Sequence, residues 1–164
     1  EFGDGFGGAA AGKPLQALAA ARHLRQHAVD AGAAGWALAG DFNSSPDDGP
    51  PLLLTTGRLP ASHPQLMSKI DHDLALPFEA PLVSAFRLVH GREPLYTRKK
   101  DALASQFCLD YVFVGGALRP SAAGFGAGPP PYTSPDGSDL AFLPNEEWPS
   151  DHLPIVVDLE EVAS

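Results

Sequence analysis

Three short polar motifs carry the side chains of this sequence that could do chemistry. They read GDFN at 40–43, LDY at 109–111 and SDH at 150–152, and each lies beside a run of apolar residues. Carboxylate oxygens can surround a divalent cation, and an imidazole next to a carboxylate is held in one tautomer. If the three motifs meet in the folded chain, they form one polar site suited to acid–base or metal-assisted chemistry.

Asp110 is the acid whose surroundings most demand a partner. On a strand over 107–114 it shares a face with Cys108, Val112 and Val114, so its carboxylate lies among apolar side chains. A buried carboxylate is costly unless it is paired or hydrogen-bonded. His152, at the start of a later strand, is the natural partner, and Asp110 would then fix the tautomer of its ring.

Each motif also has a simpler explanation, which the sequence leaves open. Asp41 and Asn43 could belong to a turn or cap a helix, because both residue types are common there. Asp110 could be a surface acid on an edge strand. His152 could be a half-buried histidine with an ordinary hydrogen bond.

The apolar pattern predicts the elements that would position the first motif. A helix is expected from Pro14 to a stop at Gly32, with apolar residues every three to four positions. A strand over 36–39 is apolar throughout and is expected to be buried on both faces, so that Asp41 lies just past its end. Asp47 or Asp48 can cap a short helix that ends at Gly57.

The other two motifs are expected on strands further along the chain. Strands are predicted over 82–86, 107–114 and 152–160, the last from its alternation, whereas 58–80 is expected to be mostly loop. The stretch 119–149 is rich in Gly, Pro and Ser and is predicted to be a long loop. Residues 1–13 are expected to be a flexible Gly/Ala-rich remnant.

Composition limits the class of protein. With 164 residues and 44% hydrophobic content, the chain is long enough for one domain with a real core. It carries 20 acidic and 11 basic residues, a formal charge of −9, so no overall positive field would attract a polyanion. The single cysteine agrees with a reducing compartment, and no apolar run approaches the roughly 18–20 residues that span a bilayer. We expect an intracellular protein, cytoplasmic or nuclear, without a membrane partner.

One basic run and several histidines complete the set of candidate residues. Lys99 and Lys100 follow Arg98 and are either a solvated loop or a local contact for phosphates. His63 and His72 lie in predicted loops without a metal-ligand spacing, so we assign them no metal.

The motifs GDFNSSPDD, CLDYVFV and PSDHLPIVVDLE, in that order, resemble the three C-terminal motifs of the endonuclease/exonuclease/phosphatase superfamily, the fold of deoxyribonuclease I and apurinic endonucleases. SHPQL at 62–66 and EPLYT at 93–97 resemble the branch that holds carbon catabolite repressor 4, nocturnin, angel and 2′,5′-phosphodiesterase. The resemblance implies an α/β (α+β) fold, the C-terminal half of a four-layer αββα sandwich of the deoxyribonuclease I type. Residues 14–164 would then be a partial domain of this family, with 119–149 as its long loop.

The resemblance also implies roles for the residues of the first two motifs. Asp41 would orient or deprotonate the attacking water and bind the metal. Asn43 would donate to a phosphate oxygen of the substrate and hold Asp41 in place. Asp110 would orient His152.

The remaining roles concern the phosphate and the metal. His152 would contact the scissile phosphate and share its developing negative charge. Asp151 would support the metal, and hard oxygen ligands favour Mg²⁺ or Mn²⁺. Lys99 and Lys100 would add contacts to substrate phosphates.

The implied function is metal-dependent phosphodiester hydrolysis, most specifically a deadenylase-like 3′ exoribonuclease that acts on an RNA 3′ end such as poly(A). One alternative is a phosphatase or phosphodiesterase acting on a small nucleotide or another phosphoester, and another is a non-catalytic interaction module. Family members place an asparagine, the main metal-binding glutamate and a histidine in an N-terminal half, and none is visible in these 164 residues. The chain is therefore expected to hold one wall of the site and to be incomplete by itself.

Overall fold

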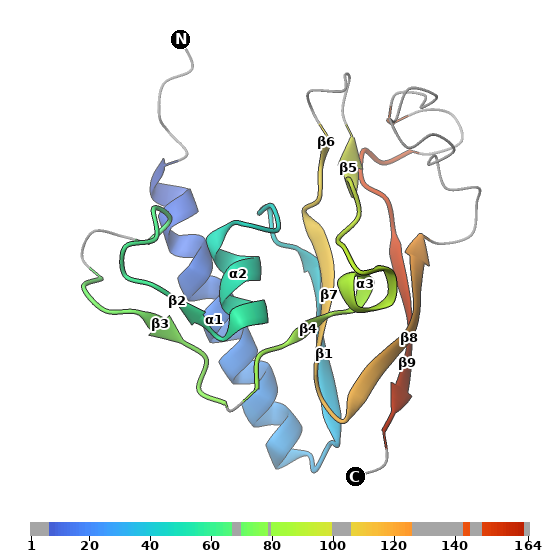
Figure 1. Cartoon of the computed structure of the whole chain (residues 1–164), viewed down its shortest axis with the longest axis horizontal. Coiled ribbons are helices and arrows are strands. Elements are labelled where there is room, and N and C mark those ends of the chain that lie inside the picture. Colours follow the sequence, from blue (N-terminus) through green and yellow to red (C-terminus); the bar gives the residue numbers. More distant parts are fainter. Residues whose placement is uncertain are drawn as a thin grey trace.

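A three-stranded antiparallel sheet lies at the centre of the chain. The computed structural model describes residues 7–66, 70–78, 80–99, 106–125, 143–144 and 149–162, with the backbone alone for 7–11. Strands β1 (Gly35–Asp41), β7 (Asp110–Gly116) and β4 (Val83–Ser84) follow one another in the order β1-β7-β4. The long helix α1 (Gly7–Asp30) runs along one side of this sheet (Figure 1).

A second helix and a short ladder extend the side of the sheet on which α1 lies. Helix α2 (Gly49–Thr56) begins with prolines and ends at Gly57, whose φ of 79° is the left-handed conformation that glycine adopts without strain. Strands β2 (Arg58–Leu59) and β3 (Leu74–Ala75) pair beyond it, and the rest of the described part of 58–80 is loop, as predicted.

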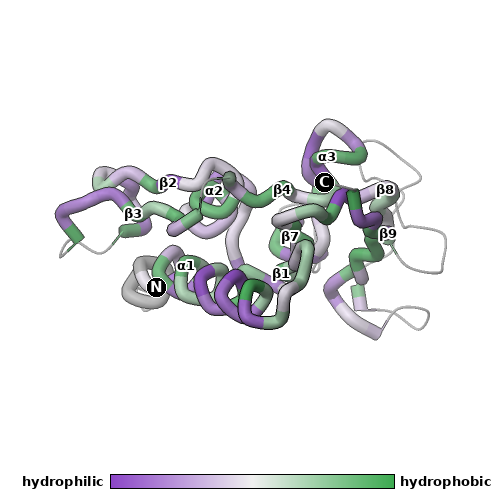
Figure 2. The backbone as a smooth tube through the Cα atoms, turned by 90° about the horizontal axis from the view of Figure 1, so that it is seen from below, coloured by the Kyte–Doolittle hydropathy of each residue, from purple (hydrophilic) through white to green (hydrophobic). Residues whose placement is uncertain are grey.

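Another antiparallel pair, β8 (Leu118–Phe125) and β9 (Ile155–Glu161), lies against β7 on the side of the central sheet away from α1, as Figures 1 and 2 agree. Helix α3 (Ala85–His90) packs on β8, where the ring centroids of Phe86 and Phe125 lie 5.4 Å apart. Strands β5 (Arg98–Lys99) and β6 (Gln106–Phe107) form a short ladder that leads into β7. The chain therefore has the mixed helix-and-sheet class that the sequence predicts.

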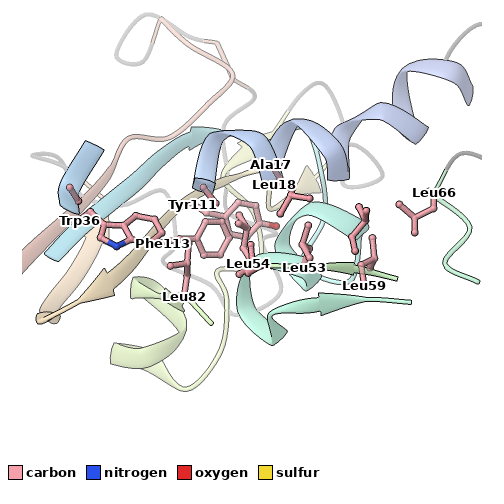
Figure 3. Close-up of a cluster of buried hydrophobic side chains, with 14 of the residues drawn as sticks. Ala17, Leu18, Trp36, Leu53, Leu54, Leu59, Leu66, Leu82, Tyr111 and Phe113 are labelled. Atoms are coloured by element: carbon pink, nitrogen blue, oxygen red, sulfur yellow. The ribbon is translucent and has the colours of Figure 1, made fainter. Parts of the chain in front are cut away.

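The main hydrophobic core fills the space between α1, α2 and the sheet. Leu53 and Leu54 of α2 are fully buried and pack with Tyr111 and Phe113 of β7 (Figure 3). Alternation along β7 points Tyr111 and Phe113 to this core and Asp110 to the opposite face. A second, smaller core consists of Tyr96, Leu143 and Leu153, with Phe125 of β8 packed against it. Among the described residues, no helix is both long and apolar enough to cross a bilayer.

The structure corrects two predictions about the N-terminal part. Helix α1 begins at Gly7 rather than at Pro14, so it takes in 7–13, which the sequence assigned to a flexible remnant. Strand β1 is an edge strand with helices on one face only, so Trp36 is buried while Ala37 and Ala39 are exposed, contrary to the strand buried on both faces.

Three further predictions are corrected in the second half. The predicted strand over 82–86 stops at Ser84, because helix α3 begins at the next residue. Ser84 and Gly91 flank this helix. The strand over 107–114 is interrupted at Cys108 and Leu109, between β6 and β7. The first part of the predicted loop over 119–149 is strand β8, which continues to Phe125. Its backbone pairs with β9, and this pairing forms despite the Gly- and Pro-rich composition. Residues 126–142 and 145–148 lie outside the described part.

Candidate active site

Two carboxylates face each other across the central ladder. The antiparallel register pairs Asp41, the last residue of β1, with Asp110, the first residue of β7. Directly opposed like charges repel, so such a pair needs hydrogen-bond donors or a cation. The structure supplies separate donors to each carboxylate.

The carboxylate of Asp41 is held by the residue two positions later. The backbone N–H of Asn43 donates to Oδ1 at 2.7 Å, and its side-chain amide donates to Oδ2 at 3.1 Å. Asn43 has a φ of 47°, in the left-handed region that asparagine tolerates better than most residues. Both residues are exposed, so this half of the site is open to solvent.

The carboxylate of Asp110 is held by two residues distant in the sequence. Oδ2 of Asp110 lies 2.8 Å from Nδ1 of His152, the hydrogen bond that the sequence predicts, and accepts a 2.6 Å bond from the hydroxyl of Thr97. The side chains of Asp110 and His152 are 19% and 28% exposed, so water screens this pair only partly. Because Nδ1 faces the carboxylate, Nε2 is the ring nitrogen directed away from Asp110.

Thr97 is the site residue that the sequence analysis missed. It is fully buried, and its Oγ1 also accepts the backbone N–H groups of Leu109 and Asp110, each at 2.9 Å. One hydroxyl thus ties β5 to the start of β7 and aims the carboxylate. Thr97 is the last residue of EPLYT at 93–97, and this motif was the only feature of the sequence that could have indicated it. Its side chain is uncharged, so the search for charged site residues did not select it.

The segment that carries His152 is fixed against β5. The backbone N–H of Lys99 donates to the carbonyl of Asp151 at 2.9 Å, and that of Leu153 donates to Thr97 at 2.7 Å. Nε of Arg98 also contacts Oδ2 of Asp151 at 3.0 Å. The Asp151 carboxylate is thereby engaged with an arginine, and it does not belong to the group of possible metal ligands; its metal role stays a prediction.

The basic run does not lie where the sequence placed it. Lys99 is only 3% exposed, and burial lowers the pKa of its ammonium group. The prediction of a solvated loop is therefore wrong for Lys99, because alternation along β5 turns this side chain inward, whereas its contact with a substrate phosphate stays a prediction. Lys100 lies outside the described residues.

The site fits a hard divalent cation. Asp41, Asp110 and His152 each offer one ligand atom, and these three atoms lie within 4.8 Å of one another. Mg²⁺ and similar ions are often held by one or two carboxylates, with water and substrate oxygens completing the coordination. Asn43 donates to both oxygens of Asp41, and Thr97 and His152 engage Oδ2 of Asp110. Asp41 is the more exposed carboxylate, so it is the one more open to an ion with its water and substrate ligands.

Comparison with known proteins agrees with this geometry. The endonuclease/exonuclease/phosphatase family pattern matches residues 6–152, a range that includes all three motifs. A curated relative, carbon catabolite repressor protein 4 homolog 4 of Arabidopsis thaliana, is 33% identical over 126 residues, which cover 75% of this chain and 26% of the relative. The chain thus spans about a quarter of the length of that relative. It belongs to the endonuclease/exonuclease/phosphatase family, with an α/β fold of that type, and is similar to the carbon catabolite repressor 4 branch.

Proposed function

We propose that this chain forms one wall of a metal-dependent phosphodiesterase site. The observation that carries the proposal is the convergence of Asp41, Asp110 and His152, from three separate segments, within 4.8 Å. Hydrolysis of a phosphodiester needs an aligned water, a Lewis acid and donors aimed at the charge that develops on the phosphorus oxygens. The site offers a group suited to each of these requirements.

Asp41 orients the attacking water and, with its second oxygen, helps to hold the divalent ion. Asn43 keeps Asp41 in place through the two bonds it already makes, and the second N–H of its amide can donate to a phosphate oxygen. Mg²⁺ or Mn²⁺ held there would supply Lewis-acid stabilisation of the phosphate charge.

His152 acts on the phosphate from the other side of the site. Its Nδ1 is held by Asp110, which orients the ring so that Nε2 can donate a hydrogen bond to the charge that develops on the phosphate. Asp110 therefore works through His152, and Thr97 supports Asp110.

The favoured substrate is the 3′ end of an RNA, removed one adenylate at a time as in a deadenylase. The resemblance of GDFNSSPDD, CLDYVFV and PSDHLPIVVDLE to the carbon catabolite repressor 4 branch supports this choice. A small nucleotide phosphoester is the second candidate. The formal charge of −9 and the burial of Lys99 favour it, because both weaken the attraction of a long polyanion.

The test compares two substrates on one protein. A protein that carries this chain is incubated with a 3′-labelled oligoadenylate and with bis(p-nitrophenyl) phosphate, each with Mg²⁺ or Mn²⁺ and after EDTA treatment. We expect EDTA-sensitive release of adenylate, lost in Asp41→Asn and His152→Ala. Turnover of the small diester alone would favour the second candidate. Turnover that EDTA leaves intact, or no hydrolysis of either substrate in a protein that also carries the family's glutamate segment, would contradict the proposal.

A further inference from the structure

The left-handed conformation of Asn43 is sparsely populated even for asparagine, and such a conformation persists when its surroundings fix it. The two bonds from Asn43 to Asp41 are one restraint on it. The loop's other contacts add further restraints.

Three successive carbonyls of this loop each accept a side-chain hydrogen bond. The hydroxyl of Ser44 donates to the carbonyl of Phe42 at 2.9 Å. Nζ of Lys13 donates to the carbonyl of Asn43 at 2.5 Å, and the hydroxyl of Tyr111 donates to the carbonyl of Ser44 at 2.9 Å. The loop 42–44 is thus held from α1 on its exposed side and from β7 on its buried side.

The buried restraint comes from Tyr111. Tyr111 is 3% exposed, and its one hydroxyl proton is shared between the carbonyl of Ser44 at 2.9 Å and that of Cys108 at 2.8 Å, so it links the loop to the residues just before β7. Phe42 packs edge-on against the rings of Tyr111 and Phe113, and its N–H donates to the carbonyl of Leu109 at 2.8 Å. Burial raises the pKa of the Tyr111 phenol, which keeps its hydroxyl a donor.

The exposed restraint depends on the early start of α1. Lys13 lies in the part of the helix before Pro14, and it reaches a loop 30 positions further along the chain. Its charge gives a stronger hydrogen bond to a carbonyl than a neutral donor would.

We propose that Lys13 and Tyr111 are positioning residues of this site. By holding the carbonyls of Asn43 and Ser44, they keep Asn43 in the left-handed conformation that folds its amide onto Asp41. The catalytic consequence rests on the proposed function, whereas the conformational consequence does not. Neither residue needs to touch substrate.

The conformational test uses the 164-residue chain itself. Carbon-13 shifts and the three-bond amide–Hα coupling of Asn43 report its backbone conformation by NMR. We expect left-handed values in the wild type and in Lys13→Arg, and a shift towards extended values in Lys13→Met and Tyr111→Phe. Arg22→Met, the same loss of charge on an exposed part of α1, is the control and should change nothing at Asn43. Unchanged Asn43 signals in a folded Lys13→Met would overturn the proposal, even if Tyr111→Phe failed to fold.

The kinetic test uses a protein that hydrolyses the phosphodiester. Lys13→Met should lower kcat about 10-fold with little change in KM, and Lys13→Arg should restore most of it. In an Asn43→Ala background, Lys13→Met should cause no further loss, because the residue acts through Asn43. A rise in KM alone would mean that Lys13 binds substrate and would overturn its positioning role. If no phosphodiester is hydrolysed, the proposed function fails, and the NMR result still decides whether Lys13 and Tyr111 hold the loop.

Discussion

Asp41 and Asp110 are opposite neighbours on β1 and β7, yet their surroundings differ. Asp41 is exposed and takes its hydrogen bonds from a residue two positions later. Asp110 is 19% exposed and takes its hydrogen bonds from Thr97, 13 positions earlier, and His152, 42 positions later. The exposed half of the site is a local loop, whereas the buried half is made by the tertiary fold.

This difference separates activity from stability. Hydrogen bonds at an exposed loop exchange with water, so their loss costs little folding free energy. Water has little access to the partly buried Asp110 carboxylate and none to the buried Thr97 hydroxyl, so loss of their hydrogen bonds destabilises the fold as well as the site. The buried half should therefore link catalysis to folding, and the exposed half should not.

The largest effects are expected on catalysis, in both halves. Asp110→Asn and His152→Ala should each lower kcat by about 10²–10⁴-fold with little change in substrate affinity, and Asp41→Asn should be as damaging because it removes the acid that aligns water. The double variant Asp110→Asn/His152→Ala should be scarcely worse than either single one. Steady-state kinetics of the cycle measure this, and additive losses would show that the two residues do not act as a unit.

Thr97 gives the next largest effect, and it should separate the two halves. Thr97→Val removes a buried hydroxyl that serves two N–H groups and a carboxylate, so we expect a loss of about 3 kcal/mol in the free energy of unfolding. Asn43→Ala, in the exposed half, should cost about 1 kcal/mol or less. Urea denaturation followed by circular dichroism gives both values. Thr97→Ser, which keeps the hydroxyl, is the control and should lose only about 1 kcal/mol through its missing methyl group. Equal losses for Thr97→Val and Asn43→Ala would contradict the comparison.

The sequence predicted the exposed half well because its chemistry is local. GDFN follows directly on an apolar run, and the Asp41–Asn43 contact spans two residues, so motif and geometry coincide. The pairing of Asp110 with His152 was also predictable, since a carboxylate on an apolar strand face needs a partner and His152 was expected at the start of a later strand. The first prediction rests on a local motif, and the second rests on the cost of burying a charged residue.

The supports of the buried half were not predictable in the same way. Thr97 acts through a neutral hydroxyl, and β5 is only two residues long, too short for any periodicity. Lys99 was placed at the surface because it is charged, although alternation along β5 turns it inward. The start of α1 and the existence of β8 were hidden by Gly-rich or Pro-rich composition, because main-chain hydrogen bonds and tertiary packing override local preference there.

A smaller effect is expected from the ion pair that fixes the His152 segment. The side chains of Arg98 and Asp151 are 27% and 32% exposed, so solvent weakens their attraction, and Arg98→Met should cost about 1 kcal/mol. Arg58→Met is a matched control, because Arg58 pairs with Asp73 but is 72% exposed, and it should cost less. Thermal or urea unfolding at low and high salt measures both. If the two variants lose the same stability, burial of the His152 segment does not strengthen its ion pair.

The smallest effect is a pH dependence at the start of the segment that leads to Thr97. Glu93 is partly buried, and desolvation raises the pKa of its carboxyl above the ordinary 4.5, although the hydroxyl of Ser84 donates to it at 2.9 Å and Arg87 lies nearby. The folded chain therefore binds this proton more tightly than the unfolded chain does. The stabilisation is complete below pH 4.5 and is lost as the pH rises through the raised pKa, because ionisation then places a charge in a partly buried position.

Glu93→Gln keeps an acceptor for Ser84 but cannot ionise. Its unfolding free energy relative to wild type should therefore rise by a fraction of a kcal/mol to about 1 kcal/mol across this window and then level off. Urea titrations at a series of pH values compare the two proteins, with Glu160→Gln, the same change at an exposed position, as the control. A difference that is constant with pH would mean that Glu93 titrates alike in the folded and unfolded chains, which would contradict the prediction.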